Sequence, residues 1–113
     1  MKFSANLGFL WADRPLPDAI RAAKAAGFDA VECHWPFEVP TDDVNAALAE
    51  TGFTMLGLNT RRGDLGRKQN GLSAVPGEEA AARAAIDEAV DYAVATGTRA
   101  IHVMAGFGEG AKA

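Results

Sequence analysis

The sequence lacks the features that mark secreted and membrane proteins. It contains one cysteine, Cys33, which excludes an intramolecular disulfide and favours a reducing compartment. No apolar run approaches the roughly 20 residues that cross a bilayer. The first residues carry no signal-peptide core, because a strand-like pattern begins at once. We therefore expect a cytoplasmic protein with no membrane partner.

Clustered positive charge is also scarce. The net charge is −4, the isoelectric point is about 5.0, and adjacent basic residues occur only at Arg61-Arg62 and Arg67-Lys68. Because phosphate backbones are bound by clustered lysine and arginine, the sequence predicts no nucleic-acid partner. With 113 residues, 49% of them apolar, we expect one globular domain spanning 1–113.

A helix, a glycine and an apolar strand follow one another three times along the chain, after a first strand. Short helix-to-strand connections of this kind predict a right-handed parallel sheet. The helices are expected to end at Gly27, Gly52 and Gly97. Their starts are expected at Pro15, at Thr41 or Asp42, and near Glu78. The expected strands are Phe3–Phe9, Ala30–His34, Thr54–Asn59 and Ala100–Gly106, and a long irregular stretch covers Thr60–Gly77.

The two faces of these strands differ in polarity. The face expected to meet the helices is apolar and carries Leu7, Val31, Cys33, Leu56, Leu58, Ile101 and Val103. The opposite face carries Ser4, Asn6, Glu32, His34, Asn59 and His102, diluted by small residues, Met55 and Met104. A doubly wound sheet would bury these polar groups at a cost. A (β/α)₈ barrel instead turns such residues toward its mouth, so the pattern favours a barrel.

Several of these polar residues have alternative interpretations. Asn6 and Asn59 either bridge neighbouring strands or contact a substrate. Glu32 is a general base, a metal ligand or a structural partner of His34 or an arginine. His102 is a satisfied core histidine, a substrate contact or a metal ligand. Three potential ligands on one face suit Mg²⁺, Mn²⁺ or Zn²⁺, although they show no short ligand spacing.

Five stretches of the sequence are distinctive when taken together: Phe3–Leu7, Ala25–Glu32, Leu58-Asn59 with its Arg/Gly/Asp loop, Gly71–Gly77 and His102–Gly106. They resemble the N-terminal part of the hydroxypyruvate isomerase family and of the related 2-oxo-tetronate isomerases. These enzymes are xylose-isomerase-like TIM barrels. The resemblance covers essentially the whole chain, and the last two stretches carry most of its weight.

The resemblance implies an enzyme that interconverts hydroxypyruvate and tartronate semialdehyde, with a small hydroxy-keto acid as substrate. Its catalytic glutamates and the ligands of a divalent metal, Mg or Mn, come mostly from strands five to eight. Since a full barrel takes about 250 residues, we expect this chain to be the N-terminal half of a TIM barrel, with four parallel strands and three helices. It would hold no catalytic residue and no metal ligand, and would be inactive alone.

The resemblance and the strand-end positions together place one wall of the substrate pocket in this chain. An arginine of the 60s loop is expected to hold the substrate carboxylate, and His102 to face its hydroxyl groups. Trp11 walls the pocket or simply packs against the core. The expected substrate-binding residues are Asn6, Trp11, Glu32, Asn59, Arg61, Arg62 and His102.

Two other interpretations remain open at this point. A half-barrel exposes the edges of its first and last strands, and such edges tend to pair. In the first alternative, the chain closes a barrel with a second copy of itself. Another activity of the same superfamily is the remaining alternative, either a sugar epimerase or an abasic-site endonuclease. An endonuclease would need more strand-end histidines and a basic surface.

Overall fold

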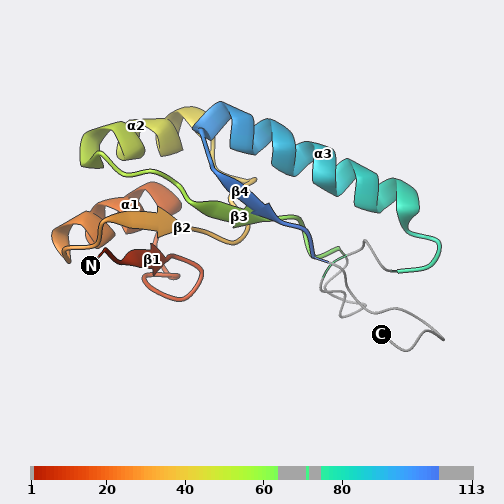
Figure 1. Ribbon diagram of the computed structural model, residues 1–113, viewed down its shortest axis with the longest axis horizontal. Coiled ribbons are helices and arrows are strands. Elements are labelled where there is room, and N and C mark those ends of the chain that lie inside the picture. The colour runs from red at the N-terminus through yellow and green to blue at the C-terminus, as the bar shows by residue number, and fades with distance from the viewer. Residues whose placement is uncertain (1, 64–70, 72–74, 105–113) are drawn as a thin grey trace.

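The structure is a computed structural model that describes residues 2–63, 71 and 75–104. Strands and helices alternate along the chain, as the sequence predicts (Figure 1). Ala105-Gly106 of the expected fourth strand and part of the Gly71–Gly77 stretch lie outside the described residues. The elements are β1 (Ser4–Asn6), α1 (Leu16–Ala25), β2 (Ala30–Glu32), α2 (Thr41–Thr51), β3 (Gly57–Asn59), α3 (Glu79–Thr96) and β4 (Ala100–His102).

The strands form one parallel series in sequence order. β1 pairs with β2, with Ala5 opposite Val31, and β3 pairs with β4, with Leu58 opposite Ile101. A parallel bridge between Val31 and Met55 joins the two pairs. Neighbouring strands that are also consecutive in the chain, each reached through a helix, are the arrangement of a β/α barrel. The predicted fold class is confirmed.

The pairing between β2 and the chain entering β3 contains one extra residue. The N–H of Val31 donates to the carbonyl of Thr54 at 3.3 Å, and the N–H of Cys33 donates to that of Gly57 at 3.0 Å. An advance of two residues along β2, from Val31 to Cys33, thus corresponds to three residues in the neighbouring segment, from Thr54 to Gly57. The extra residue forms a β-bulge. The bulge makes the expected alternation wrong at two positions. Met55 is buried in the core with 2% exposure, whereas Leu56 lines the opposite face.

The helix ends show where sequence rules hold and where they fail. Gly52 and Gly97 adopt left-handed φ values of 71° and 67° and end α2 and α3 as predicted. The expected side-chain cap of α2 is wrong, because Pro40 occupies the cap position and makes no such bond. Asp42 and Asp43 instead lie in the first turn, where the helix dipole favours negative charge.

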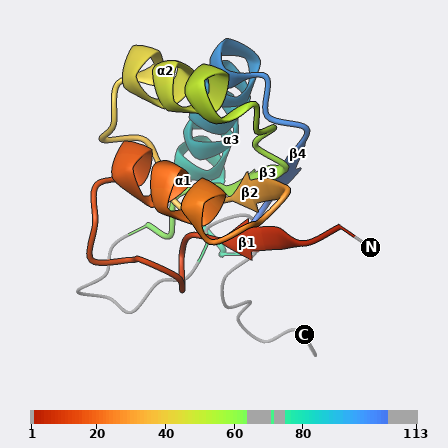
Figure 2. The ribbon, with the colours of Figure 1, turned by 90° about the vertical axis from the view of Figure 1, so that its left-hand side faces the viewer.

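The hydrophobic core lies between the helices and one face of the strands. Ile20 of α1, Val31 of β2 and Leu58 of β3 are buried, and α3 contributes small side chains such as Ala89. The three helices lie on the same side of the strands (Figure 2). Burial of one large aliphatic side chain stabilises a fold by about 1.5–3 kcal/mol, so this layer holds the domain together.

The last strand leaves apolar surface exposed. Val103 was expected to meet the helices, but it is 43% exposed because it follows the end of β4 and no described helix comes after it. On α3, Val90 and Val94 are also exposed. None of the described helices is long and apolar enough to cross a membrane.

Candidate functional site

The helices cover one face of the strands (Figure 2). A groove of about 510 Å³ lies along the polar residues of the other face. All four strands contribute to it, as expected for the interior of a barrel. Its polar lining residues are Asn6, Glu32, His34, Asn59 and His102. The structure therefore brings together four of the seven expected substrate-binding residues and adds His34.

Pairing of the strands explains why these side chains are neighbours. Asn6 lies opposite Glu32 in the β1–β2 pair, and Asn59 lies opposite His102 in the β3–β4 pair. Asn6 also has a structural role, since its Oδ1 accepts the N–H of Gly8 at 2.9 Å and shapes the turn after β1. Its amide NH₂ group remains as a hydrogen-bond donor.

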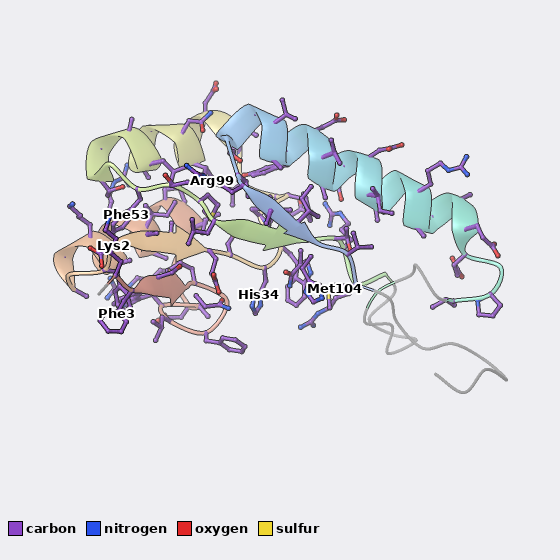
Figure 3. All side chains as sticks on the ribbon, in the orientation of Figure 1. Lys2, Phe3, His34, Phe53, Arg99 and Met104 are labelled. Carbon is purple, nitrogen blue, oxygen red and sulfur yellow. The ribbon has the colours of Figure 1, made fainter. Side chains whose placement is uncertain are left out.

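His34 occupies a closely fitted position beside the groove. Its ring meets Phe9 edge-on at 5.0 Å and Trp35 at 5.1 Å between centroids. A Cβ atom at Gly8 would lie 2.2 Å from the ring, so only glycine allows this placement. Figure 3 shows His34 on the side of the strands away from α2 and α3.

The charge state of His34 follows from its surroundings. Burial lowers the pKa of the imidazole below its ordinary value, and the positive charge of Arg62 lowers it further, while Glu32 opposes the shift. His34 is therefore neutral at pH 7. A neutral imidazole has one N–H donor and one acceptor nitrogen, and it can share a proton with a substrate oxygen.

Thr60 connects the segments that follow three of the strands. Its N–H donates to the carbonyl of His102 at 3.0 Å, and its Oγ1 accepts the N–H of Met104 at 2.9 Å. Its carbonyl accepts the indole N–H of Trp35 at 3.0 Å. Thr60 is only 2% exposed. Sequence reasoning placed it at the start of a loop and missed this role, although a polar residue directly after a buried strand was the available signal.

Gly71 brings the loop after β3 back to the end of β4. Its N–H donates to the carbonyl of Arg62 at 2.7 Å, and its φ is 116°. A Cβ atom there would lie 2.3 Å from the backbone of Met104, a residue labelled in Figure 3 near the end of β4. The close approach explains why a glycine stands at this position.

The two adjacent arginines, both expected to bind substrate, have different surroundings. Arg61 is paired with Glu88 at 2.7 Å and with Glu38 at 3.1 Å, and its guanidinium lies 5.1 Å from the ring centroid of Phe37. The hydrogen bond to Glu88 is the main reason why its pKa is raised. Arg61 therefore links α3 to the loop after β2.

Among the residues that the structure describes, Arg62 makes no such ion pair. Its guanidinium lies 3.8 Å from the ring centroid of Trp35, and its Nε atom is buried without a hydrogen-bond partner. A cavity of about 180 Å³ is lined by these two residues together with Arg61 and Gly63. Within the described residues, Arg61 is thus ion-paired, whereas Arg62 is stacked on Trp35 without an ion pair.

Trp11 does not line the groove. It packs against the core, and its ring meets Phe28 edge-on at a centroid distance of 6.2 Å. Its φ of 54° marks the sharp turn between β1 and α1. Of the two interpretations of Trp11, the structure supports packing.

The metal hypothesis finds no ligand set in the part of the chain that the structure describes. No three His, Cys, Asp or Glu side chains there group in a way that could hold an ion, so Glu32, His34 and His102 do not form a site together. Cys33 is buried, and burial raises the pKa of its thiol to about 12. The thiol is therefore protonated at neutral pH and unsuited to act as a nucleophile.

Four consecutive parallel strands, helices on their outer face and a polar groove within define this chain as part of a β/α barrel. Residues 20–113 match the family model described as Xylose isomerase-like TIM barrel. The chain belongs to this family, and the resemblance noted in the sequence is confirmed.

Curated relatives resemble the chain over nearly all of its length. It is 42% identical over 107 residues to the human protein named putative hydroxypyruvate isomerase, a match that covers 94% of this chain and 39% of the relative. It is 39% identical over 103 residues to the 2-oxo-tetronate isomerase of Haemophilus influenzae, covering 91% and 40%. The chain thus spans about two fifths of the length of these relatives.

A solved structure shows the same fold. The crystal structure of an AP endonuclease, family 2, from Brucella melitensis superimposes with a TM-score of 0.87 and 32% sequence identity. The match covers 96% of this chain and 42% of that one.

Proposed function

We propose that this chain forms the N-terminal, substrate-binding wall of an isomerase barrel acting on small hydroxy-keto acids, such as hydroxypyruvate. The observation that carries the proposal is the meeting of Asn6, Glu32, Asn59 and His102, one from each strand, around a single groove. The names of the curated relatives support the isomerase activity.

The groove offers hydrogen-bonding groups that suit such a substrate. A hydroxy-keto acid presents a carboxylate, a hydroxyl and a carbonyl, and its isomerisation moves a proton between adjacent carbons. In the proposal, the amide of Asn59 and the imidazole of His102 orient the substrate oxygens, and neutral His34 shares a proton with one of them. Holding the reacting atoms in one geometry is a large part of catalysis.

The proposal assigns no catalytic carboxylate and no metal ligand to this chain. No group of three His, Cys, Asp or Glu side chains among the described residues could hold a metal ion. A Mg²⁺ or Mn²⁺ ion and the acid/base pair belong, in the proposal, to polypeptide beyond this chain. The chain alone is therefore expected to be inactive, because acid/base groups contribute about 10²–10⁴-fold to such reactions.

A chimera tests this proposal. The corresponding N-terminal part of the Haemophilus influenzae 2-oxo-tetronate isomerase is replaced by this chain, and turnover of 2-oxo-tetronate and hydroxypyruvate is measured. The chimera should isomerise at least one of them, and the chain alone should not. Asn59→Ala in the chimera should lower kcat/KM about tenfold, since one lost substrate hydrogen bond costs about 1–3 kcal/mol.

Arg83→Gln on the exposed surface of α3 is the matched control and should leave kcat/KM unchanged. A folded chimera without isomerase activity, or ordinary turnover by the chain alone, would contradict the proposal. Cleavage of DNA containing an abasic site would favour the activity named for the Brucella structure, although a net charge of −4 disfavours DNA binding.

A second candidate is a half-barrel that associates with a copy of itself without catalysis. The exposed side chains of Val90, Val94 and Val103 favour it, because apolar surface next to an open strand edge tends to be covered. Analytical ultracentrifugation distinguishes the two. A well-folded monomer at high concentration contradicts association.

A further inference from the structure

The pair formed by Arg62 and Trp35 is the feature that the groove lining leaves unexplained. Arg62 follows β3 and Trp35 follows β2, so both stand at the carboxyl ends of the strands. The guanidinium lies 3.8 Å from the indole centroid, a distance at which cation–π attraction is strong. Among the described ion pairs Arg61 has two carboxylate partners, whereas Arg62 has none.

Stacking on Trp35 uses none of the hydrogen-bond donors of Arg62. A guanidinium carries five N–H donors in its plane, and an aromatic ring beneath it satisfies none of them directly. The Nε atom of Arg62 is out of contact with water and has no partner among the described residues. The two Nη groups are therefore the donors of this guanidinium that a ligand would meet.

Trp35 is itself fixed in place. Its indole N–H donates to the carbonyl of Thr60 at 3.0 Å, and Thr60 is tied to β4 through His102 and Met104. The ring therefore forms a platform that sets the height and tilt of the guanidinium. Trp35 is a positioning residue, and Arg62 is the group that meets the ligand.

Two observations link this pair to the groove. The ring of Trp35 lies 5.1 Å from that of His34, which lines the groove. The charge of Arg62 also lowers the pKa of His34, so a charge that binds at Arg62 is felt at His34. Glu32 and His102 are the other charged or titratable groups that act on this imidazole.

We propose that Arg62, held on Trp35 at the rim of the groove, binds the carboxylate of the substrate through the in-plane edge of its guanidinium, and that Arg61 does not. A planar carboxylate matches this edge and accepts two parallel hydrogen bonds. The assignment of that carboxylate to a hydroxy-keto acid rests on the proposed function. The arginine itself is assigned from the structure.

Equilibrium binding to the 113-residue chain tests the assignment without catalysis. The probe is glycerate, which cannot isomerise, and glycerol is the matched probe without a carboxylate. Binding is followed by the ¹H NMR signal of the His34 ring across a pH titration. The sequence has two histidines, so His102→Gln assigns the signal. Glycerate should raise the pKa of His34, because its negative charge offsets that of Arg62, and glycerol should not.

Substitutions separate the two arginines. Arg62→Gln should weaken glycerate binding about tenfold or more, since a hydrogen bond to a charged group contributes about 1.5–3 kcal/mol. Arg62→Lys keeps the charge but loses the planar fork, and should bind with intermediate affinity. Trp35→Phe keeps a ring but loses the indole N–H, and should weaken binding less than Arg62→Gln. Arg61→Gln should cost less affinity than any Arg62 variant, and Arg83→Gln none.

Several outcomes would overturn the assignment. These are unchanged glycerate affinity in folded Arg62→Gln or Arg62→Lys, an equal loss in Arg61→Gln, or equal binding of glycerol or inorganic phosphate. Failure of the proposed function gives a different result. In that case glycerate binding depends on Arg62, but the chimera turns over no hydroxy-keto acid. An active chimera whose turnover is unchanged by substitution of Arg62 contradicts only this inference.

Discussion

The two faces of the strands serve different purposes in this molecule. The face toward the helices is apolar and buried: Val31 and Leu58 of the strands, and Ile20 of α1 in the same core, are almost without exposure. The face toward the groove carries half-buried or exposed polar groups such as Glu32, Asn59 and His102. The difference indicates that the helix-covered face contributes most of the stability, whereas the groups proposed to bind substrate lie on the other face.

The largest expected effect comes from emptying the helix-covered face. Ile20→Ala removes a fully buried side chain of α1 and should lower the free energy of unfolding by about 2–5 kcal/mol. Asn59→Ala on the groove face should change it by less than about 1 kcal/mol. Urea unfolding followed by circular dichroism measures both. Equal losses in the two variants would contradict the separation of the faces.

Thr60 is buried and joins the segments that follow β2, β3 and β4, so its substitution sharpens the comparison. Thr60→Val keeps the shape but leaves the N–H of Met104 without its acceptor, which should cost about 1–3 kcal/mol. Thr60→Ser keeps the hydroxyl and should cost less. Because Trp35 is held by the backbone of Thr60, a shifted indole fluorescence in Thr60→Val, absent in Thr60→Ser, would report the coupling. Identical stability in both variants would show that the hydroxyl bond is unimportant.

The smallest expected effect is the pH dependence of the free energy of unfolding that is due to His34 on the groove face. The pKa of His34 is lowered in the folded state, so the unfolded chain binds more protons below about pH 6.5. Stability due to this group is thus complete above that pH and decreases as the pH falls toward the folded-state pKa. The free energy of unfolding of His34→Gln, measured by urea titration, should decrease less between about pH 7.5 and 5.5 than that of the unchanged protein. The same or a steeper loss in the variant would contradict a lowered pKa.

Local patterns were sufficient to predict the order of elements and much of the groove. Glycine after each apolar helix face, and polar residues late in each strand, placed Asn6, Glu32, Asn59 and His102 correctly around one groove. These features depend on neighbours in the sequence. Their role in binding substrate stays a prediction.

Long-range packing limited the remaining predictions. Arg61 and Arg62 are identical in type and adjacent, and only the fold brings Glu38 and Glu88 to one and Trp35 to the other. The tie made by Thr60 likewise depends on residues some 25 to 44 positions away in the chain. No local pattern contains such information.

The extra residue before β3 affects how this chain is to be aligned with other barrels. Side chains of a regular strand point alternately to the core and to the groove. If this alternation is counted from Met55, it assigns Leu58 and Asn59 to the wrong faces, because the extra residue at Leu56 shifts it by one position. A gap of one position in an alignment would have the same effect. Equivalent pocket residues in homologous enzymes therefore need to be matched through their hydrogen-bonded neighbours in the sheet rather than through numbering.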